Sequence, residues 1–383
     1  MALRKNPFFD GGKICKVLFL YERGDFLSKG TFTKPPAPYE NEKDHPILPD
    51  RMAPAALFGL SSDCVCNVSD VCTSNETDYT MVLSRLQDEV SSKFEPKKKS
   101  SCALSEVYFD LDLKSRSFRV SDCGTFLEYY VTKDQKKLHN ANFCKDRLCP
   151  MCNWRRSLKI YGQVSQVMDY LEKDNYRFLF LTLTVKNCSA EDLPCTVQAL
   201  YDGWRYMYNK SPVFKSVIAG TFRSLEVTRN KKTGEFHPHL HVILAVRPDY
   251  FKKKYLTQAQ WQALWRKSCN LAYDPIIDIR VIKPGPNGLS GAVAEVSKYA
   301  VKDSDFLVGT HDEKLSYVSA FLNALTARRL ISFTGCFNKA RKLLNLDDAE
   351  TGDLVHVDDD TLREDVATMI VRYGWRNGVY VRI

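Results

Sequence analysis

The sequence lacks the features of a membrane, secreted or repeat protein. No run of about 18 consecutive apolar residues occurs, so no membrane-spanning helix is expected. Residues 1–24 lack the long apolar core and cleavage site of a signal peptide, and no internal repeat is visible. Histidine is also scarce, with 7 residues in 383. We therefore expect a cytoplasmic protein without a membrane partner. Because histidine is scarce, a cluster of histidines would indicate a metal or catalytic site.

The composition is that of an ordinary globular protein with a mild excess of positive charge. Hydrophobic residues make up 44% and charged residues 26% of the chain, which excludes wholesale disorder and a fibrous protein. Lysine and arginine total 55 against 46 acidic residues, a formal net charge of +9. This excess favours a polyanionic partner such as nucleic acid, because basic side chains that neutralise phosphates release bound counterions.

Two stretches divide the first hundred residues. Residues 28–55 hold six prolines among polar residues, which is typical of an extended linker or arm. Residues 94–101, FEPKKKSS, predict a second boundary. Between them, the spacing of apolar residues in 81–92 predicts one helix. No function follows from this part of the sequence.

From residue 105 onward, strand and helix patterns mix without the regular alternation of a parallel sheet. We therefore expect an α+β fold with an antiparallel central sheet and flanking helices. The apolar, β-branched run at 177–185 predicts a buried central strand. The other expected elements are strands at 108–113 and 118–122, a hairpin over 221–246, helices at 196–209, 257–271 and 291–301, and a hairpin around Asn377 and Gly378.

The segment FHPHLHVILAV places three of the seven histidines within five residues. His237, His239 and His241 stand two residues apart, and side chains alternate along a strand, so all three share one face. Two imidazoles so placed can bind one metal ion. Pro238 favours a strand start or edge, which would leave His237 outside the regular ladder as the weaker ligand. Solvated histidines on an edge hairpin are the alternative.

A carboxylate on the preceding strand completes a candidate metal site. The loop NKKTGE joins TFRSLEVTRN to the histidine strand, and centring it between Lys232 and Thr233 places Glu226 opposite His239. The Cβ atoms of such cross-strand partners lie roughly 4.5 to 5.5 Å apart, close enough to share a metal ion. Two histidines and one carboxylate suit Mn²⁺ or Mg²⁺, with open positions for phosphate oxygens.

A tyrosine follows on a later expected helix. In SGAVAEVSKYAVKDSD, Glu295, Tyr299 and Lys302 are spaced i, i+4 and i+7, so on a helix they project from one face. The reference pKa of tyrosine is near 10, so attack on a phosphodiester at neutral pH needs a metal-polarised phosphate or a nearby base. This spacing is common in surface helices, but its place after the histidine strand favours catalysis.

Four cysteines form a candidate zinc site. Cys144, Cys149 and Cys152 are spaced C-x4-C-x2-C, and Cys123 offers a fourth thiolate upstream. In a cytoplasmic protein, clustered thiols are read as metal ligands before disulfides. Four thiolates around Zn²⁺ would make a closed structural site. His139 is the alternative fourth ligand, and buried free thiols are the alternative to zinc.

Three ordered motifs resemble those of the replication initiators of small rolling-circle bacterial plasmids, which belong to the HUH endonuclease superfamily. FLTLTVKN, ending at Asn187, is similar to the first motif, HPHLH (237–241) to the histidine motif and EVSKYAVK (295–302) to the tyrosine motif. The cysteine pattern is also similar, and the resemblance spans about residues 118–355. It implies a ferredoxin-like or RRM-like catalytic sheet with a small zinc-binding module.

The resemblance implies a role for each residue of the motifs. Tyr299 would attack the scissile phosphate and become joined to the 5′ end, and the released 3′ hydroxyl would prime synthesis. His239 and His241 would hold the catalytic metal, with Glu226 as an inferred third ligand. One branch of the family has a glutamate four residues before the tyrosine, as Glu295 is here, which would activate water for the terminating cleavage. Lys302 would neutralise the phosphate or orient the tyrosine.

The expected organisation follows from these motifs. The parts are an N-terminal module and linker (1–104), a zinc-binding segment (105–160), a nicking domain (161–345) and a C-terminal extension (346–383). The candidate DNA-binding residues are Arg155 and Arg156, after the last cysteine, and Arg328 and Arg329 in LTARRLISFTG.

The expected partner is plasmid origin DNA, supercoiled or single-stranded at the nick, with a dimer on the DNA as a candidate assembly. The resemblance also implies a host helicase and replication machinery. A transposase or relaxase of the same superfamily is the nearest alternative function. A non-catalytic zinc-containing DNA-binding regulator is the alternative from another class.

Overall fold

The structure is a computed structural model that describes residues 79–283, 286–298, 302–357 and 369–383. These residues belong to one compact unit, 77–383. None of the described helices is both long and apolar enough to cross a membrane. The proline-rich stretch at 28–55 lies outside the described residues.

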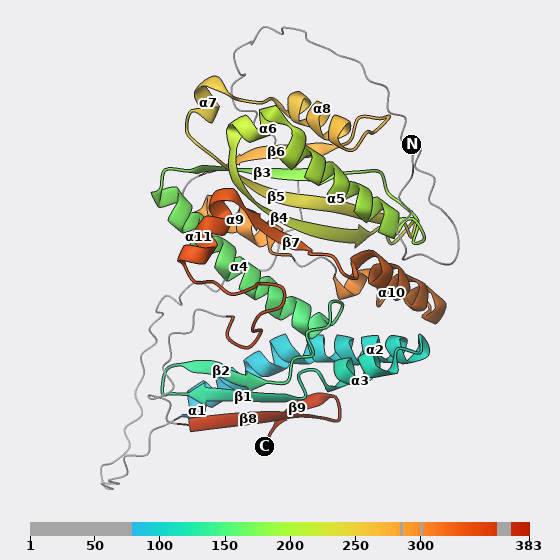
Figure 1. The fold of residues 1–383 in the computed structure, drawn as a ribbon. Coiled ribbons are helices and arrows are strands. Elements are labelled where there is room, and N and C mark those ends of the chain that lie inside the picture. Colours follow the sequence, from blue (N-terminus) through green and yellow to red (C-terminus); the bar gives the residue numbers. More distant parts are fainter. Residues whose placement is uncertain (1–78, 284–285, 299–301, 358–368) are drawn as a thin grey trace, which may run out of the picture. The chain divides into compact units, whose positions relative to one another are not determined.

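A five-stranded antiparallel sheet carries the histidine motif, with strand order β6-β3-β5-β4-β7 (Figure 1). The sheet and its flanking helices confirm the expected α+β class. The predicted strand at 177–185 is β3, and the predicted hairpin is β4 with β5, the middle strand. The strands are β3 (Arg177–Thr184), β4 (Ile218–Arg229), β5 (Phe236–Val246), β6 (Ile277–Ile282) and β7 (Ile331–Thr334).

Helices pack on both faces of this sheet. Helix α5 lies on one face, where the guanidinium of Arg223 on β4 stacks on the Tyr201 ring of α5. Helix α8 packs on α5 and β6. On the other face, α9 contacts β5, β6 and α4, while α11 contacts β4 and α4. These and neighbouring helices are α4 (Pro150–Lys173), α5 (Leu193–Lys210), α6 (Pro212–Val217), α7 (Tyr250–Lys253), α8 (Gln258–Ser268), α9 (Pro286–Val296), η2 (Asp303–Asp305), α10 (His311–Leu325) and α11 (Gly335–Leu343).

A second, four-stranded sheet has the order β2-β1-β8-β9. The first strand after Cys123, β1, therefore pairs with β8 near the end of the sequence, while β2 and β9 form the two edges. The predicted C-terminal hairpin is confirmed: Asn377 and Gly378 have φ angles of 49° and 83°, as a tight hairpin turn requires. The elements are α1 (Thr80–Glu89), η1 (Val90–Phe94), α2 (Glu95–Asp110), α3 (Lys114–Asp122), β1 (Phe126–Val131), β2 (Lys136–Ala141), β8 (Met369–Arg376) and β9 (Val379–Arg382).

Three local predictions are wrong. The expected strands at 108–113 and 118–122 fall largely in helices α2 and α3, and the expected boundary at 94–101 lies inside continuous helix. Phe94, Lys98 and Ser101 are all buried and stand at i, i+4 and i+7, which is helical spacing. The charged run was predicted to be an exposed boundary, but Lys98 is buried and donates to the carbonyl oxygen of Cys123 at 2.9 Å.

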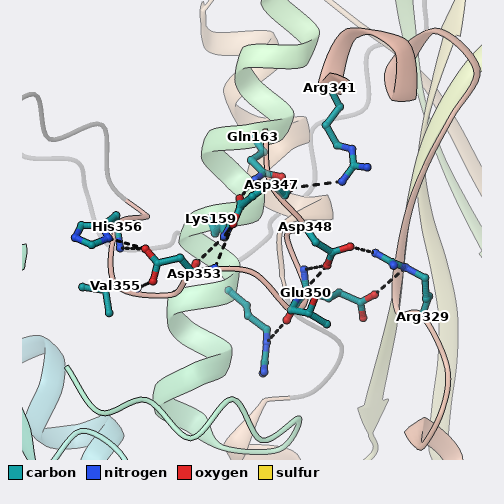
Figure 2. A network of polar contacts seen from close by, with 12 residues as sticks. Lys159, Gln163, Arg329, Arg341, Asp347, Asp348, Glu350, Asp353, Val355 and His356 are labelled. Carbon is teal, nitrogen blue, oxygen red and sulfur yellow. Dashed lines mark hydrogen bonds and ion pairs between the residues drawn. The ribbon is translucent and has the colours of Figure 1, made fainter. Parts of the chain in front are cut away.

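Helix α4 is tied to the loop at 345–357 by buried polar side chains. Figure 2 shows Lys159 and Gln163 of α4 meeting this loop. Lys159 Nζ donates to the carbonyl oxygen of Asp353 at 2.6 Å, and Gln163 Nε2 donates to Asp347 Oδ1 at 2.9 Å. The helix that begins in the cysteine cluster is therefore held at its middle by a distant segment of the chain.

Candidate metal centres

The β4–β5 hairpin sets the register of the first candidate centre. Asn230 Oδ1 accepts a hydrogen bond from the backbone N–H of Lys232 at 2.9 Å, and Gly234 takes a φ of 74° that favours glycine. With this loop, Glu226 pairs with His239 in the ladder, which confirms the predicted register. The carboxylate and the histidine motif therefore lie on the same face of the sheet.

Three ligand atoms converge on this face. The Nε2 atoms of His239 and His241 are 3.1 Å apart, and Glu226 Oε2 lies 3.0 Å from His241 Nε2 and 3.4 Å from His239 Nε2. All three side chains are buried. Ligand bonds of about 2.0 to 2.2 Å that meet at right angles place their donor atoms about 3 Å apart. The spacing therefore fits one small metal ion.

The outer nitrogens of the two imidazoles are already used. His239 Nδ1 lies 3.0 Å from the carbonyl oxygen of His237, which can only accept, so this nitrogen carries the proton. His241 Nδ1 lies 3.2 Å from Thr182 Oγ1 on β3. These contacts orient the rings and leave both Nε2 atoms facing Glu226. In metal sites, a hydrogen bond to the outer nitrogen of a histidine commonly fixes the ring in this way. Lone pairs this close repel unless a proton or a cation lies between them.

The carboxylate of Glu226 stays ionised at this position. Burial acts to raise its pKa, but when protons rather than a metal ion lie between the three side chains, the hydrogen bonds and charge of His239 and His241 outweigh burial and hold the pKa well below its ordinary value. A buried, ionised carboxylate beside two imidazole nitrogens is a suitable ligand set for Mn²⁺ or Mg²⁺.

His237 is not part of this group of three. Its Nδ1 contacts Asn187 Oδ1 at 2.8 Å, at the end of the first motif. The expectation that it lies outside the ladder is wrong, because His237 belongs to β5 and pairs with Thr228 of β4. Pro238 is tolerated in this middle strand because β3 stops pairing at Thr184, opposite His239, so no ladder bond is lost.

Two further predicted residues lie beside the trio. Glu295, on α9, has its Oε1 atom 3.7 Å from His241 Nε2, and Lys298 Nζ holds its other oxygen at 2.5 Å. Lys302 Nζ lies 3.4 Å from Glu226 Oε1. Tyr299 lies outside the described residues. Lys298 and Thr182 were missed by sequence reasoning, although Lys298 has the i, i+3 spacing from Glu295 of a helical ion pair.

The helix expected at 291–301 ends earlier than predicted. Helix α9 ends at Val296, and Lys302 has an extended backbone (φ −92°, ψ 144°). Glu295 and Lys302 therefore do not share a helical face at i, i+7. Lys302 still reaches Glu226 because the chain leads into the short helix η2, and Asp305 N–H donates to the carbonyl oxygen of Lys302 at 2.9 Å.

The second candidate centre is formed by the four predicted cysteines. Their Sγ atoms lie 3.5 Å (Cys123 to Cys152), 3.6 Å (Cys149 to Cys123) and 3.7 Å (Cys144 to Cys152) apart. Tetrahedral zinc with Zn–S bonds of about 2.3 Å places its sulfurs about 3.8 Å apart. The cluster therefore could hold zinc. His139 is not in it, because its ring stacks on Tyr130.

Backbone N–H groups point at the sulfur atoms of this cluster. Lys145 N–H lies 3.2 Å from Cys152 Sγ, and Asp146 N–H lies 3.4 Å from Cys144 Sγ. Lys145 reaches this geometry with a φ of 58°. With zinc bound, these amide donors and the buried Lys98 ammonium near Cys123 would offset the charge of the four thiolates.

If the four cysteines hold zinc, removing the ion is expected to loosen the segment from Cys123 to Cys152 and the sheet that continues from it, because metal affinity at such a site is folding free energy. A chelator should expose roughly four thiols per released ion to alkylation. The exposed Cys195 serves as the internal control, since it should react with or without chelator. Protein purified without chelators that contains no zinc would contradict the assignment.

Arg155 and Arg156 are not placed to contact DNA. Both are buried and donate to backbone carbonyl oxygens: Arg155 Nε to Leu354 at 3.0 Å and Arg156 Nε to Glu350 at 3.1 Å. Their role is to attach α4 to the loop at 345–357. These arginines were predicted to contact DNA phosphates because they follow the last cysteine in the sequence, and that position gives no information on their burial.

Arg328 and Arg329 lie just before β7. Arg329 is exposed and pairs with Asp348 at 2.6 Å and with Glu350 at 3.4 Å (Figure 2). Arg328 is half-buried, and its Nη1 donates to Gln198 Oε1 at 2.5 Å. Neither residue lies in the metal trio.

Comparison with known proteins gives the family. The family described as "Replication protein" matches residues 135–381. The chain belongs to the replication protein family. This match includes the histidine hairpin, α9 and three of the four cysteines, which places it with plasmid replication initiators.

Several curated relatives share this replication protein's sequence. A protein rep of Bacillus amyloliquefaciens is 35% identical over 75% of this chain and 92% of its own length. A protein rep of Streptococcus pneumoniae is 37% identical over 71% and 85%, and one of a Bacillus species is 41% identical over 62% and 84%. No solved structure matches the chain significantly.

Proposed function

We propose that this replication protein starts rolling-circle replication by nicking one strand of the plasmid origin through a covalent 5′-phosphotyrosine intermediate. The observation that carries the proposal is the convergence of Glu226, His239 and His241 within 3.0 to 3.4 Å. Glu295 and Lys302, which flank Tyr299 in the sequence, reach this trio from α9 and the segment after it.

In the proposed reaction, the Tyr299 oxygen attacks the scissile phosphorus. A bond forms between this oxygen and the 5′ phosphate, and the bond to the 3′ oxygen breaks, so a 3′ hydroxyl is released for priming. Glu226, His239 and His241 would hold Mn²⁺ or Mg²⁺, which when bound polarises the phosphate. Lys302 offsets charge around the phosphate, since its ammonium already lies beside the Glu226 carboxylate.

Incubation with supercoiled origin DNA and Mn²⁺ tests the proposal. We expect relaxed circles and protein covalently joined to the 5′ end at the nick, and EDTA should prevent both. Binding to the origin without any cleavage would favour a zinc-containing DNA-binding regulator instead. Cleavage of transposon ends or a transfer origin, but not of a replication origin, would favour a transposase or a relaxase.

Glu295 is proposed to act in the second reaction. Its carboxylate lies 3.7 Å from His241 Nε2, close enough to accept a proton from a water placed near the next scissile bond. Lys298 fixes the other carboxylate oxygen at 2.5 Å. Hydrolysis by such a water would let an enzyme with one tyrosine terminate replication.

Glu295→Gln is expected to nick normally but to fail in terminating hydrolysis, because the amide keeps the shape and removes the base. Replication products longer than one unit length would measure the defect. Lys298→Met is the matched variant. It removes the ammonium that holds the Glu295 carboxylate but leaves the carboxylate available as a base, so terminating hydrolysis should weaken less than in Glu295→Gln. If Glu295→Gln loses initial nicking, the carboxylate serves as a metal ligand or as the base for Tyr299.

The proposal also sets the partners. Origin DNA is the substrate, and a host helicase and the replication machinery would extend the released 3′ end. A reaction on plasmid DNA places the protein in the cytoplasm. A dimer on the DNA remains a candidate assembly.

A further inference from the structure

A pocket of about 410 Å³ opens on the face of the five-stranded sheet opposite the metal trio. Arg223 lies three residues before Glu226 on β4, so the two side chains point to opposite faces. Thr334 of the edge strand β7 and the face of α5 also line the pocket. Pockets of roughly 300 to 1,000 Å³ are typical for small ligands.

Arg223 is a buried cation with no carboxylate at ion-pair distance in the described part of the chain; Glu350, the acidic group that acts on it from further away, is paired with Arg329 at 3.4 Å. It is 6% exposed, and its Nε and Nη1 atoms find no hydrogen-bond partner among the described residues. Its Nη2 atom makes one long hydrogen bond, 3.4 Å, to the carbonyl oxygen of Arg329. A buried guanidinium with unused donors is costly, and an anion in the pocket would supply the missing partner.

Aromatic rings form the wall beside this cation. Tyr201, Trp204 and Tyr208 stand at i, i+3 and i+7 on α5 and line the pocket together. The guanidinium of Arg223 lies 4.5 Å from the centre of the Tyr201 ring. The rings of Trp204 and Tyr208 are 6.2 Å apart and tilted by 35°. Aromatic rings beside arginine are the features on which nucleobases stack in single-strand binding proteins.

A second arginine adds positive charge that acidic groups do not cancel. Arg328 forms no ion pair within the described ranges, and its Nη1 atom is held by Gln198. The other two arginines of the pocket are paired, Arg329 with Asp348 and Arg205 with Asp202. Arg223 and Arg328 are therefore the groups that an anionic ligand would engage.

We propose that this pocket binds one nucleotide, with its phosphate at Arg223 and Arg328 and its base against the α5 aromatic rings. The DNA strand that is cut at the metal trio is the favoured source, and in this respect the inference rests on the proposed function. Arg223 and Glu226 are about 10 Å apart along β4 but on opposite faces, so a DNA strand that passes round the edge at β7 would reach the pocket several nucleotides from the cut bond. A free nucleotide is the other source.

The test combines a protein variant with a DNA variant. Affinity for a single-stranded oligonucleotide spanning the nick site is measured without metal, with one abasic nucleotide placed at each position in turn. We expect one position, a few nucleotides from the nick, where the abasic change weakens wild-type binding about tenfold. Arg223→Gln should weaken binding of the intact oligonucleotide about tenfold and make that abasic change nearly neutral. Arg266→Gln, an exposed arginine of α8 paired with Asp274, is the matched control and should bind normally.

The outcomes separate the sources. In one outcome, no abasic position changes the affinity, but dAMP alone quenches the fluorescence of Trp204, with Trp204→Phe as the reference. The pocket would then bind a free nucleotide, and the proposal that its ligand comes from the DNA strand would be wrong. Normal binding by Arg223→Gln and no dAMP response would overturn the proposal. Inorganic phosphate that competes as well as dAMP would overturn base stacking. If Arg223→Gln does not fold, Arg328→Gln should show the same loss. Failure of wild-type protein to nick would contradict the proposed function but not this binding result.

Discussion

Replacing Tyr299 with phenylalanine is expected to abolish nicking while origin binding remains. The change removes only the oxygen that would form the bond to phosphorus and keeps the ring. Loss of a covalent nucleophile typically lowers a rate on the order of 10⁴-fold or more. Conversion of supercoiled origin DNA to relaxed circles measures the rate, and labelled 5′ DNA on the denatured protein measures the covalent adduct.

A matched substitution makes this result interpretable. Tyr170, on α4, is 40% exposed and lies outside both candidate centres, so Tyr170→Phe should nick like the wild type. Origin binding should be equal for both variants in a binding assay without metal. A Tyr299→Phe protein that nicks at a rate near that of the wild type would exclude Tyr299 as the nucleophile.

His241→Ala and His239→Ala are expected to lose metal-dependent cleavage, and His241→Ala should have the larger effect. His241 Nε2 lies within 3.1 Å of both other ligand atoms, so its loss also leaves the buried Glu226 carboxylate with less compensation. Changing an outer partner of a metal ligand typically costs 10- to 100-fold in metal affinity, so losing a ligand should cost more than about 100-fold. Titration of cleavage with Mn²⁺ measures the effect.

Thr182→Val supplies the graded control. The valine keeps the shape of the threonine on β3 but removes the oxygen that lies 3.2 Å from His241 Nδ1. We expect metal affinity to fall about 10- to 100-fold, with activity restored at high Mn²⁺. Metal-dependent cleavage that survives His239→Ala and His241→Ala would reduce the hairpin to a structural role.

Sequence reasoning was most accurate where one local rule decided the geometry. The register that pairs Glu226 with His239 followed from the hairpin loop and from the two-residue repeat of a strand. The cysteine cluster followed from ligand spacing. Both depend on short stretches of chain, whose backbone geometry is limited by sterics and hydrogen bonding.

The errors share a different cause. Arg155 is basic in sequence but buried in the fold, because its partner, the carbonyl oxygen of Leu354, is supplied by a segment about two hundred residues away. Lys302 reaches Glu226 although α9 ends before it. The pocket at Arg223 combines α5, β4 and β7. Such placements depend on which distant segments pack together, and no local pattern encodes that.

The pairing of β1 with β8 constrains how the protein can be made. The chain must be synthesised from Val131 through the whole histidine-bearing sheet to Met369 before β1 acquires its second neighbour. A nascent chain on the ribosome would therefore expose one edge of β1 until translation of β8, although the cysteines are already present. Ordering of the module that contains the four cysteines is thus coupled to completed synthesis, so truncated products would carry the histidine hairpin on an unfinished scaffold.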